Sequence, residues 1–396
     1  MTDHKITTEI VIIGGGLVGL TMAISLAAEN VSVILIDKNS EHDFLDQKFD
    51  ARASAISYGS KEFLEKYNLW DEIEEYAGKI NDILVKDRDS LLSLEFNKNI
   101  ISANPMGYIV NNKAIYAALF KAARQYNNLK ILLSTEYKNI NFLDDSVKVL
   151  LADQRQITAK LLIASDGKRS NIRKLLSIKT IDRDYHQDAI ICNIKHQNHH
   201  NEIAIERFFP AGPFAMLPMV GGYQSAIVWT AKRDKVKNFL SLDKVAFEKE
   251  LAKRCDESLG EISLVSDRVS YPLKLTLARK YTAHRVAFIG DSIHGMHPLA
   301  GQGYNLAVRD ISSLLIEIIN AGYMKYDIGS KEILSAYQKS RYVDSISMAG
   351  MTHGLNALFS NDIMPLKLLR RLGLSLVDNL PFIKKKIVKH AMFGIR

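Results

Sequence analysis

The chain has 396 residues, of which 47% are hydrophobic and 24% are charged, a composition typical of a globular protein with a sizeable core and not of a disordered one. Its two cysteines show neither CxxC nor Cys/His spacing, which excludes a disulfide framework and a zinc site, and no apolar run of about 18 residues predicts a membrane-spanning helix. The net charge of +8 is concentrated in residues 367–396, where eight Lys or Arg accompany one acid, so the nearly neutral remainder argues against nucleic acid as a partner.

The first predicted elements form a complete βαβ unit. A short apolar strand at Thr8–Ile13 is followed by a glycine-rich turn, a helix at Leu20–Glu29 and a second strand at Val31–Ile36. Because the first strand begins within ten residues of Met1, we expect no signal peptide and a cytoplasmic protein.

The elements that follow alternate between helices and strands. Strands are predicted between 80 and 110, at 130–151 as a hairpin, at 161–164, through most of 180–282 (226–230 being the clearest) and at 286–289. Helices are predicted at 60–75, 112–125, 243–255 and 304–320, and in the chain after residue 330. This alternation favours a mixed α/β protein.

The turn from Gly14 to Gly19 is typical of a dinucleotide-binding site. Gly14 permits the tight turn, Gly16 lets the backbone approach a pyrophosphate, and Gly19 lets the helix pack closely on the strand. Asp37 follows at the end of the second strand, where its carboxylate would hold the hydroxyls of an adenosine ribose without a 2′-phosphate. A structural glycine turn without a ligand is the alternative, and this unit alone does not distinguish FAD from NAD.

Two later strand ends favour FAD. One buried strand runs into Asp166 and Gly167, and another runs into Gly290 and Asp291. A carboxylate at a strand end beside a glycine turn, as at Asp291, is suited to binding a ribityl hydroxyl.

A second glycine turn, Gly301-Gln302-Gly303, stands before the predicted helix that contains Asn305. Its backbone N–H groups and the positive end of the helix dipole would face the flavin N1 and O2 atoms, where negative charge builds on reduction. We therefore predict that FAD is held across three separated segments, the last of which runs from Gly290 to Asn305.

With these motifs the sequence resembles the class A flavoprotein monooxygenases, and among them the ubiquinone-biosynthesis hydroxylase family. The stretch HPLAGQGYNLAVRD at 297–310 is close to that family's signature and departs from it mildly at Ala307, where glycine is more common. Further matching segments follow in the family's order along nearly the whole chain: Asp50–Ala53, Ala55–Ser57, Glu206–Pro218, Tyr337–Asp344 and Leu358–Asn361.

The resemblance implies further contacts to the cofactors. Arg52 would contact FAD, while Asp166 and Gly167 would lie near the cofactor and also serve the pyridine nucleotide. No second Rossmann motif occurs in the sequence, so NAD(P)H is expected to bind only transiently.

The resemblance also implies the reaction. NAD(P)H reduces the flavin, O2 adds to give a C4a-hydroperoxyflavin, and the distal oxygen passes to an electron-rich phenolic ring, here that of a polyprenylated phenol. Pro298, Ala300 and Gly301 match the loop that borders the reacting edge of the flavin and are the predicted catalytic residues. No general base is assigned, because the sequence does not identify what accepts the phenol's proton.

Three other side chains invite a chemical role. His294 and His297 are three residues apart in a glycine-rich loop without a nearby cluster of carboxylates, so structural roles are favoured over a metal pair or a proton role. Tyr304 is interpreted in the same way. No metal site is predicted.

The basic C-terminus predicts two amphipathic helices. Leu366–Val377 has leucines at helical spacing with basic residues between them, and after Pro381 apolar residues recur on one face while four lysines occupy another. Such helices bind anionic membrane surfaces, where a polyprenylated phenol would reside, so a peripheral location at the inner membrane is expected. The alternative is packing against the protein body with the lysines in water.

The predicted fold is α/β: a Rossmann-like FAD-binding domain (1–78, 108–178 and 284–364), an inserted mixed or antiparallel β-sheet substrate domain (79–107 and 179–283) and a C-terminal helical region (365–396). The predicted function is FAD-dependent hydroxylation of a polyprenylated phenol in ubiquinone biosynthesis, with membership of a biosynthetic complex as a further expectation. The alternatives are a related hydroxylase of a soluble phenol and a noncatalytic flavin-binding subunit.

Overall fold

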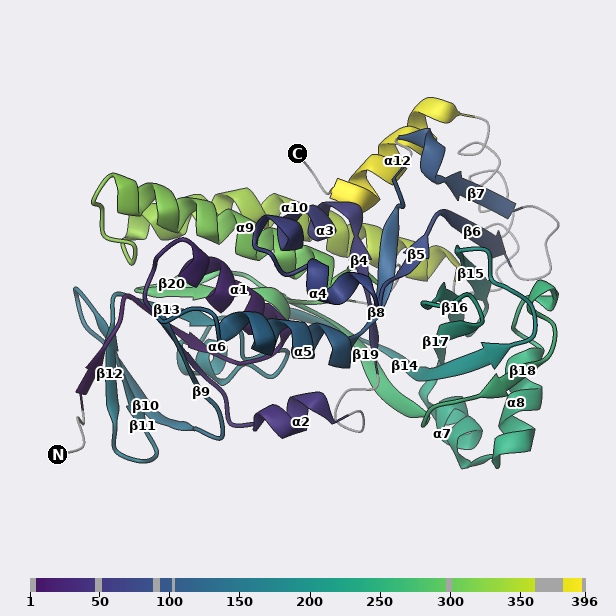
Figure 1. The fold of residues 1–396 in the computed structure, drawn as a ribbon, viewed down its shortest axis with the longest axis horizontal. Helices are drawn as coiled ribbons and strands as arrows, with labels where there is room; N and C mark the ends of the chain where they lie inside the picture. The colour runs from purple at the N-terminus through teal and green to yellow at the C-terminus, as the bar shows by residue number, and fades with distance from the viewer. Residues whose placement is uncertain are drawn as a thin grey trace.

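The computed structural model describes residues 5–46, 52–87, 93–101, 104–296, 301–359 and 380–393. A six-stranded sheet forms one half of the molecule, and helices cover it (Figure 1). In order across the sheet its strands are β20 (Thr282–Ala283), β21 (Val286–Phe288), β13 (Leu161–Ala164), β2 (Ile10–Ile13), β3 (Val33–Ile36) and β9 (Leu129–Leu132). All pairings are parallel except that of β20, so the predicted βαβ unit is confirmed.

The chemistry of these strands explains their central position. β2, β3 and β13 consist almost entirely of Ile, Val and Leu and are buried at every residue, as expected of parallel strands covered on both faces. Helix α1 (Leu17–Ala28) is also buried on nearly all sides, since it contacts β3, α5 (Asn112–Ala123) and α9 (Gln302–Tyr323). The helix that follows the glycine turn is thus anchored in the main core.

Two small sheets adjoin this core. One contains β1 (Lys5–Thr7), β12 (Gln156–Ala159), β11 (Val147–Leu151) and β10 (Tyr137–Phe142). The other contains β4 (Ala53–Ser57), β8 (Gly107–Asn111) and β5 (Gly78–Ile80). Short helices lie at α2 (Glu41–Leu45), α3 (Tyr58–Lys66), α4 (Asp71–Glu74) and α6 (Asn171–Leu175).

A nine-stranded sheet forms the other half of the molecule (Figure 1). Its order is β22 (His294–Gly295), β19 (Val269–Ala278), β14 (Thr180–His196), β17 (Gln224–Lys232), β16 (Gly212–Pro218), β15 (Ile203–Phe209), β6 (Asp82–Asp87) and β7 (Ser93–Asn97), with β18 (Ile262–Leu264) paired to β14. Helices α7 (Arg233–Ser241) and α8 (Lys244–Ala252) cover one face, where Phe214 and Trp229 pack against Phe247. We call this the outer face and the opposite one the inner face.

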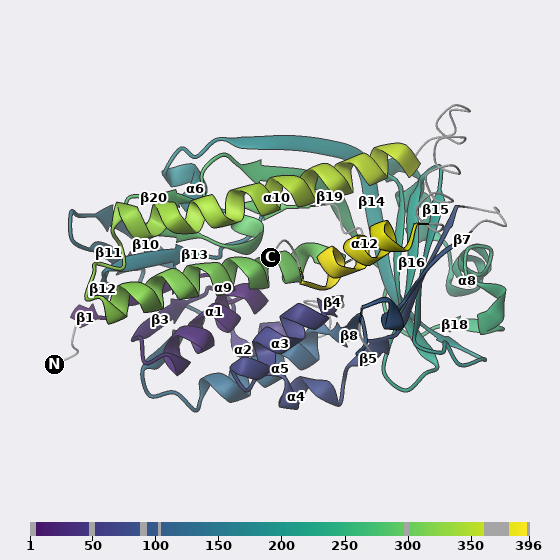
Figure 2. The same ribbon diagram turned by 90° about the horizontal axis from the view of Figure 1, so that it is seen from above.

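Two long helices run beside each other along the molecule, α9 and α10 (Lys331–Phe359), as both ribbon views show (Figure 2). The last described helix, α12 (Pro381–Phe393), contacts α3 and β4. No helix in the described ranges is long and apolar enough to cross a bilayer.

The fold class predicted from the sequence is confirmed, and most elements lie where they were expected. Three helices were missed: the five-residue helices α2 and α6, and α7, which falls within a section predicted to be mostly strand. Of the nine residues of α7 only Val236 is buried, so its apolar signal was too weak to separate it from the strands on either side. The division into domains stays a prediction. Cys192 and Cys255 are both buried as free thiols in the cluster beneath the outer face.

Candidate active site

The glycine turn between β2 and α1 is dictated by close packing. Gly14 has a φ of 111°, and a Cβ there would lie 2.4 Å from the carbonyl oxygen of Ser165. A Cβ on Gly19 would lie 1.9 Å from the carbonyl oxygen of Gly14. Gly16 differs, because the atom nearest to a Cβ there would be the hydroxyl oxygen of Tyr116, 3.9 Å away. The backbone at the start of α1 is therefore open to a ligand.

Asp37, at the end of β3, supports this turn directly. Its Oδ2 accepts a hydrogen bond from the Gly15 N–H at 2.6 Å, and its Oδ1 accepts one from the Asn39 N–H at 2.8 Å. The residue remains partly exposed. Each carboxylate oxygen has two lone pairs, so binding of a ribose hydroxyl is compatible with these bonds. The ribose contact itself stays a prediction.

The second predicted segment adjoins the first at the end of β13. The hydroxyl of Ser165 donates to the Gly14 carbonyl oxygen at 2.8 Å. Asp166 Oδ2 accepts hydrogen bonds from the N–H groups of Asn171 and Ile172 at the start of α6, whereas its Oδ1 is buried without a partner in the described part of the protein. Gly167 has a φ of 75° and open space around it.

Arg173 joins this segment to the third. Its guanidinium is buried and donates to the carbonyl oxygens of Lys168 at 2.8 Å and Ser292 at 2.5 Å. Ser292 belongs to the short turn after β21 that also contains Gly290 and Asp291. The side chain of Asp291 is 43% exposed and so is accessible to a ribityl hydroxyl.

The start of α9 packs closely on β4. Gly301, with a φ of 61°, caps the helix, and a Cβ on it would lie 2.5 Å from the Ala55 side chain. Asn305, a predicted cofactor residue, uses its amide within the protein: it accepts from the Ser57 N–H at 2.8 Å and donates to the Ala55 carbonyl oxygen at 2.9 Å. Asn305 therefore fixes β4 against the helix. Gly303 is exposed, and a Cβ on it would meet nothing within 4 Å, so the helix N-terminus is open there.

The remaining predicted site residues differ in where they lie and in whether the structure describes them. Gln302 is buried. Arg52 is exposed, and its guanidinium carbon lies 5.3 Å from the centre of the Tyr271 ring on β19. Pro298 and Ala300 lie outside the described residues, as does His297. The role of Pro298, Ala300 and Gly301 at the reacting edge of the flavin stays a prediction.

His294 and Tyr304 have structural partners. His294 is buried with its Nε2 atom 2.5 Å from Asp310 Oδ2. The hydroxyl of Tyr304 lies 2.9 Å from that of Thr21 in the interface of α1 and α9, and burial raises its pKa to about 12. No group of His, Cys, Asp and Glu among the described residues is arranged to bind a metal.

The sequence did not single out the charged groups that hold Gly290 in place. Asp310 accepts from the Gly290 N–H at 3.0 Å, from His294, and from Arg341 Nε at 2.8 Å. Arg341 also donates to Asp344, which accepts from Arg309. We call these five side chains, His294, Arg309, Asp310, Arg341 and Asp344, the buried charge network. The available signal was the charged pair Arg309-Asp310 between the apolar residues Val308 and Ile311.

Electrostatics within the buried charge network favour an ionised Asp310. Burial by itself would raise the pKa of this carboxyl group, but His294 and Arg341 together hold it below its ordinary value. The pKa of Arg341 is raised by its carboxylate partners although burial opposes this. The turn after β21 therefore rests on a fixed negative charge.

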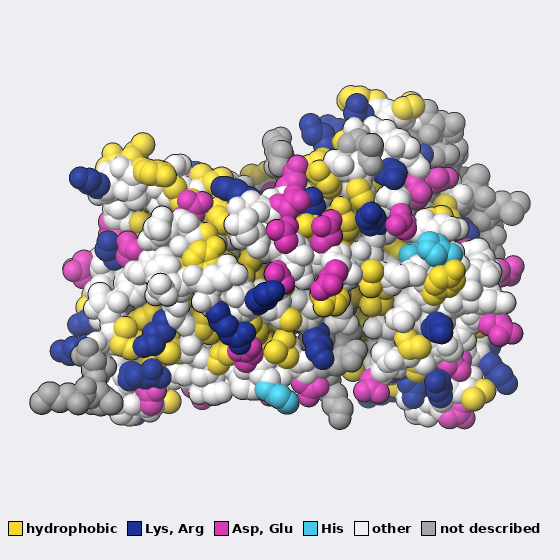
Figure 3. All heavy atoms as spheres, viewed as in Figure 1, with side chains coloured by type: hydrophobic (Ala, Val, Ile, Leu, Met, Phe, Trp, Pro, Cys, Tyr) yellow, Lys and Arg dark blue, Asp and Glu magenta, His cyan; other side chains and the backbone are white. Residues whose placement is uncertain are grey.

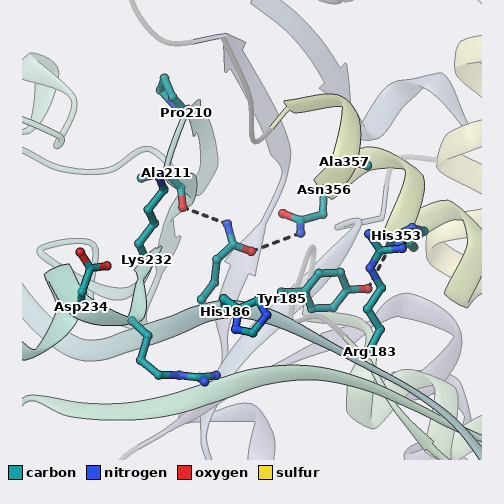
Figure 4. A pocket seen from close by; sticks show the side chains of 12 residues that line it. Arg183, Tyr185, His186, Pro210, Ala211, Lys232, Asp234, His353, Asn356 and Ala357 are labelled. Atoms are coloured by element: carbon teal, nitrogen blue, oxygen red, sulfur yellow. Dashed lines mark hydrogen bonds between the residues drawn. The ribbon is translucent and has the colours of Figure 1, made fainter. Parts of the chain in front are cut away.

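A separate cavity of about 530 Å³ lies between β14, the turn that joins β15 to β16, the start of α7 and the end of α10 (Figure 4). His353 on α10 faces Arg183 and Tyr185 on β14, with contacts of 3.3 Å to each. Asn356 donates to Gln187 at 3.2 Å. None of the predicted cofactor residues lines this cavity, so it is distinct from the glycine turns.

Comparison with known proteins agrees with this geometry. Residues 7–343 match the family model described as FAD binding domain. The chain is 36% identical to ubiquinone hydroxylase UbiL of Rhodospirillum rubrum over 97% of its length and 89% of the relative. It is 28% identical to 3-demethoxyubiquinol 3-hydroxylase of Escherichia coli, over 97% of this chain and 98% of that one.

The fold has a close counterpart among solved structures. p-Nitrophenol 4-monooxygenase PnpA from Pseudomonas putida superposes with a TM-score of 0.80, at 18% identity, over 99% of this chain and 100% of that one. The family model and the relatives cover nearly the whole chain, in agreement with the resemblance noted in the sequence. The chain belongs to the family of FAD-dependent monooxygenases that act as ubiquinone-biosynthesis hydroxylases.

Proposed function

We propose that this enzyme hydroxylates the aromatic ring of a polyprenylated phenol at a membrane surface, with FAD as its bound cofactor, NAD(P)H as transient reductant and O2 as the source of oxygen. The observation that carries the cofactor assignment is the convergence of β2, β13 and β21. The ends of these adjacent parallel strands bring together the glycine turn, the Asp166 segment and the Asp291 turn. Ligands of open α/β sheets bind at such strand ends.

The residues present fit FAD. The open backbone at Gly16 and the N-terminus of α1 suit the pyrophosphate, while Asp37 and Asp291 suit the hydroxyls of ribose and ribityl. The N-terminus of α9, left open at Gly303, suits the end of the flavin that gains negative charge. When bound, FAD supplies the redox chemistry, and this chain supplies position, electrostatics and exclusion of water.

The membrane part of the proposal rests on α12. One side of this helix packs into the protein, with Val388 and Met392 buried among Leu94, Phe96 and Met106. This face of the helix therefore packs against the protein body. Phe382 is 79% exposed and Ile387 is 40% exposed, while Lys385, Lys386 and Lys389 are also exposed. Figure 3 shows basic and hydrophobic side chains together at the position of α12.

Exposed apolar side chains beside lysines are suited to the headgroup region of an anionic bilayer, which also contains the polyprenylated substrate. The predicted helix at Leu366–Val377 lies outside the described residues. The membrane test is sedimentation with vesicles of phosphatidylglycerol and phosphatidylcholine. We expect binding that weakens several-fold in the double variant Phe382→Ser, Ile387→Ser.

A matched control for that test is Tyr323→Ser, because Tyr323 is 82% exposed at the far end of α9. Its removal should leave vesicle binding unchanged. Equal binding by the wild type and the α12 variant would contradict the role of α12, and absence of sedimentation with anionic vesicles would contradict membrane association altogether. Copurification with other ubiquinone-biosynthesis proteins would test membership of a complex.

The chemical part of the proposal is tested with the purified holoenzyme. It should be yellow, and under anaerobic conditions NADH or NADPH should bleach the flavin in the presence of a prenylated phenol. Admission of O2 should then give the hydroxylated phenol, detected by mass spectrometry with ¹⁸O₂. A yellow protein that no phenol and nucleotide together can bleach would instead indicate a noncatalytic flavin-binding subunit.

A further inference from the structure

One carboxyl group in the nine-stranded sheet has surroundings unlike those of the other acids. Glu206 lies in the middle of β15. Its strand neighbours Ile205 and Arg207 belong to the outer face, where Ile205 joins the cluster packed under α7 and α8 and Arg207 donates to the carbonyl oxygens of Arg254 and Cys255. Since side chains alternate along a strand, Glu206 points to the inner face.

The inner face lies next to the candidate flavin site. Ala204, two residues before Glu206 on the same face, packs in one cluster with Ala53 and Ala55 of β4. Ala55 is the residue that contacts Gly301, the cap of the helix predicted to face the flavin. Phe208, two residues after Glu206, packs against Leu358 at the end of α10. Glu206 thus stands between β4 and α10, on the surface facing the cofactor side.

The immediate surroundings of Glu206 are apolar. Its partners across the sheet are Ala215 on β16 and Val85 on β6, and the same face carries Ala204 and Phe208 along β15. No hydrogen bond or ion pair joins its carboxyl group to the described part of the chain. The residue has intermediate exposure, so it is not sealed inside the packed core.

Burial alone raises the pKa of Glu206 to about 7. No titratable group on the adjoining elements contributes to this shift, including Asp87, which lies opposite Phe208 on the same face of β6, and His353 on α10. A carboxyl group that titrates near neutrality accepts a proton readily and releases it again.

A purely structural role does not account for this residue. Removing a carboxyl group even partly from water costs folding free energy, and this one gains no hydrogen bond or ion pair from the described residues in return. The side chains nearest to it on this face are small, among them Ala204 and Ala215. Unpaired carboxyl groups of this kind are typical of sites that act on a ligand.

We propose that Glu206 is a catalytic residue that accepts the hydroxyl proton of the phenolic substrate. The O–H bond of the phenol breaks, the proton joins a carboxylate oxygen of Glu206, and the electron pair stays on the phenolate oxygen, where it enriches the ring for attack on the oxygen atom supplied through FAD. At the attacked ring carbon a C–O bond forms and the C–H bond breaks, and this ring proton leaves with the second oxygen atom of O2 as water. The product phenolate then takes the proton back from Glu206, which returns to its carboxylate form. This inference rests on the proposed hydroxylation.

The test uses the holoenzyme with a phenol that the wild type hydroxylates, and compares Glu206→Gln with the wild type across pH 5.5 to 8.5. We expect product formation to fall roughly 100-fold and the pH-dependent limb near 7 to disappear, because glutamine cannot accept the proton. Anaerobic reduction of the flavin by NAD(P)H should change less than twofold, and O2 should be consumed with release of H2O2. Glu206→Asp should restore part of the product yield.

The matched control is Glu202→Gln, which makes the same change of charge four residues earlier, at a side chain that accepts a hydrogen bond from Asn81. It should leave the pH profile unchanged. A Glu206→Gln enzyme with the wild-type product yield and pH profile would overturn the assignment while leaving the hydroxylase function intact. A wild type that hydroxylates no phenol would overturn both.

Discussion

Replacement of Asp310 by Asn removes the negative charge at the centre of the buried charge network. In the wild type this carboxylate accepts three hydrogen bonds, from Gly290, His294 and Arg341, and it is completely buried. Asparagine offers one oxygen, and its NH2 group would face a donor. Removal of one partner from a buried ion pair costs about 3–5 kcal/mol. Since whole proteins are stable by roughly 5–15 kcal/mol, this loss would be a large fraction of the total.

The measurement is urea unfolding of the FAD-loaded wild type and the Asp310→Asn variant at pH 7.5. The pKa of Asp310 is lowered in the folded protein, so its contribution is complete above its unfolded pKa of about 3.9 and is lost as pH falls through the lower folded value. The control is Glu72→Gln, which breaks the exposed pair with Lys121 and should cost less than about 1 kcal/mol. A loss below about 1 kcal/mol for Asp310→Asn would refute the reasoning.

Three further predictions concern the cofactor and the inner face. Gly19→Ala forces a Cβ to within 1.9 Å of the Gly14 carbonyl oxygen, so the purified variant should lack bound FAD by absorbance. Gly322→Ala, at the far end of α9, meets no atom within 4 Å and should retain it. Asn305→Ala removes the hydrogen bonds to Ala55 and Ser57 and should lower the free energy of unfolding by about 1–3 kcal/mol. FAD should also be lost faster in a dialysis assay, and unchanged retention would show that these hydrogen bonds are not needed to position β4. Glu206→Gln should become more stable relative to the wild type as pH rises from 4.5 to 7. The pKa of Glu206 is raised to about 7 in the folded protein, so over this range the unfolded wild type loses the proton while the folded wild type keeps it, which favours unfolding. The difference in the free energy of unfolding should reach about 3 kcal/mol, and parallel stability curves would disprove it.

The sequence predicted those parts of the fold whose structure depends on a short run of neighbouring residues. The strand at Leu161–Ala164 was predicted with the bounds that the structure gives, because an apolar run ends there at a polar, glycine-containing turn. The spacing of Gly14, Gly16 and Gly19 predicted a turn whose close contacts are now explicit. The strand and the glycine spacing are both patterns within about ten residues, although the contact of Gly14 with Ser165 is not.

What the sequence could not show depends on contacts between distant residues. Asn305 was predicted to serve the cofactor, but its amide binds Ala55 and Ser57, about 250 positions earlier. Glu206 appeared only as the first letter of a matching run, since nothing local says which face of a sheet it occupies or that Ala215 and Val85 surround it. Strand register and pairing decide both roles, and one sequence read alone does not determine them.

The short strand β22 joins the two halves of the molecule. It begins three residues after Asp291 and pairs with β19, so the turn that reaches toward the cofactor and the sheet that carries Glu206 share one hydrogen-bonded ladder. A backbone ladder resists sliding far more than contacts between side chains do. Backbone hydrogen bonds, and not side-chain packing alone, therefore hold the Asp291 turn against the nine-stranded sheet. Any opening that admits a long isoprenoid chain has to come from segments outside this ladder.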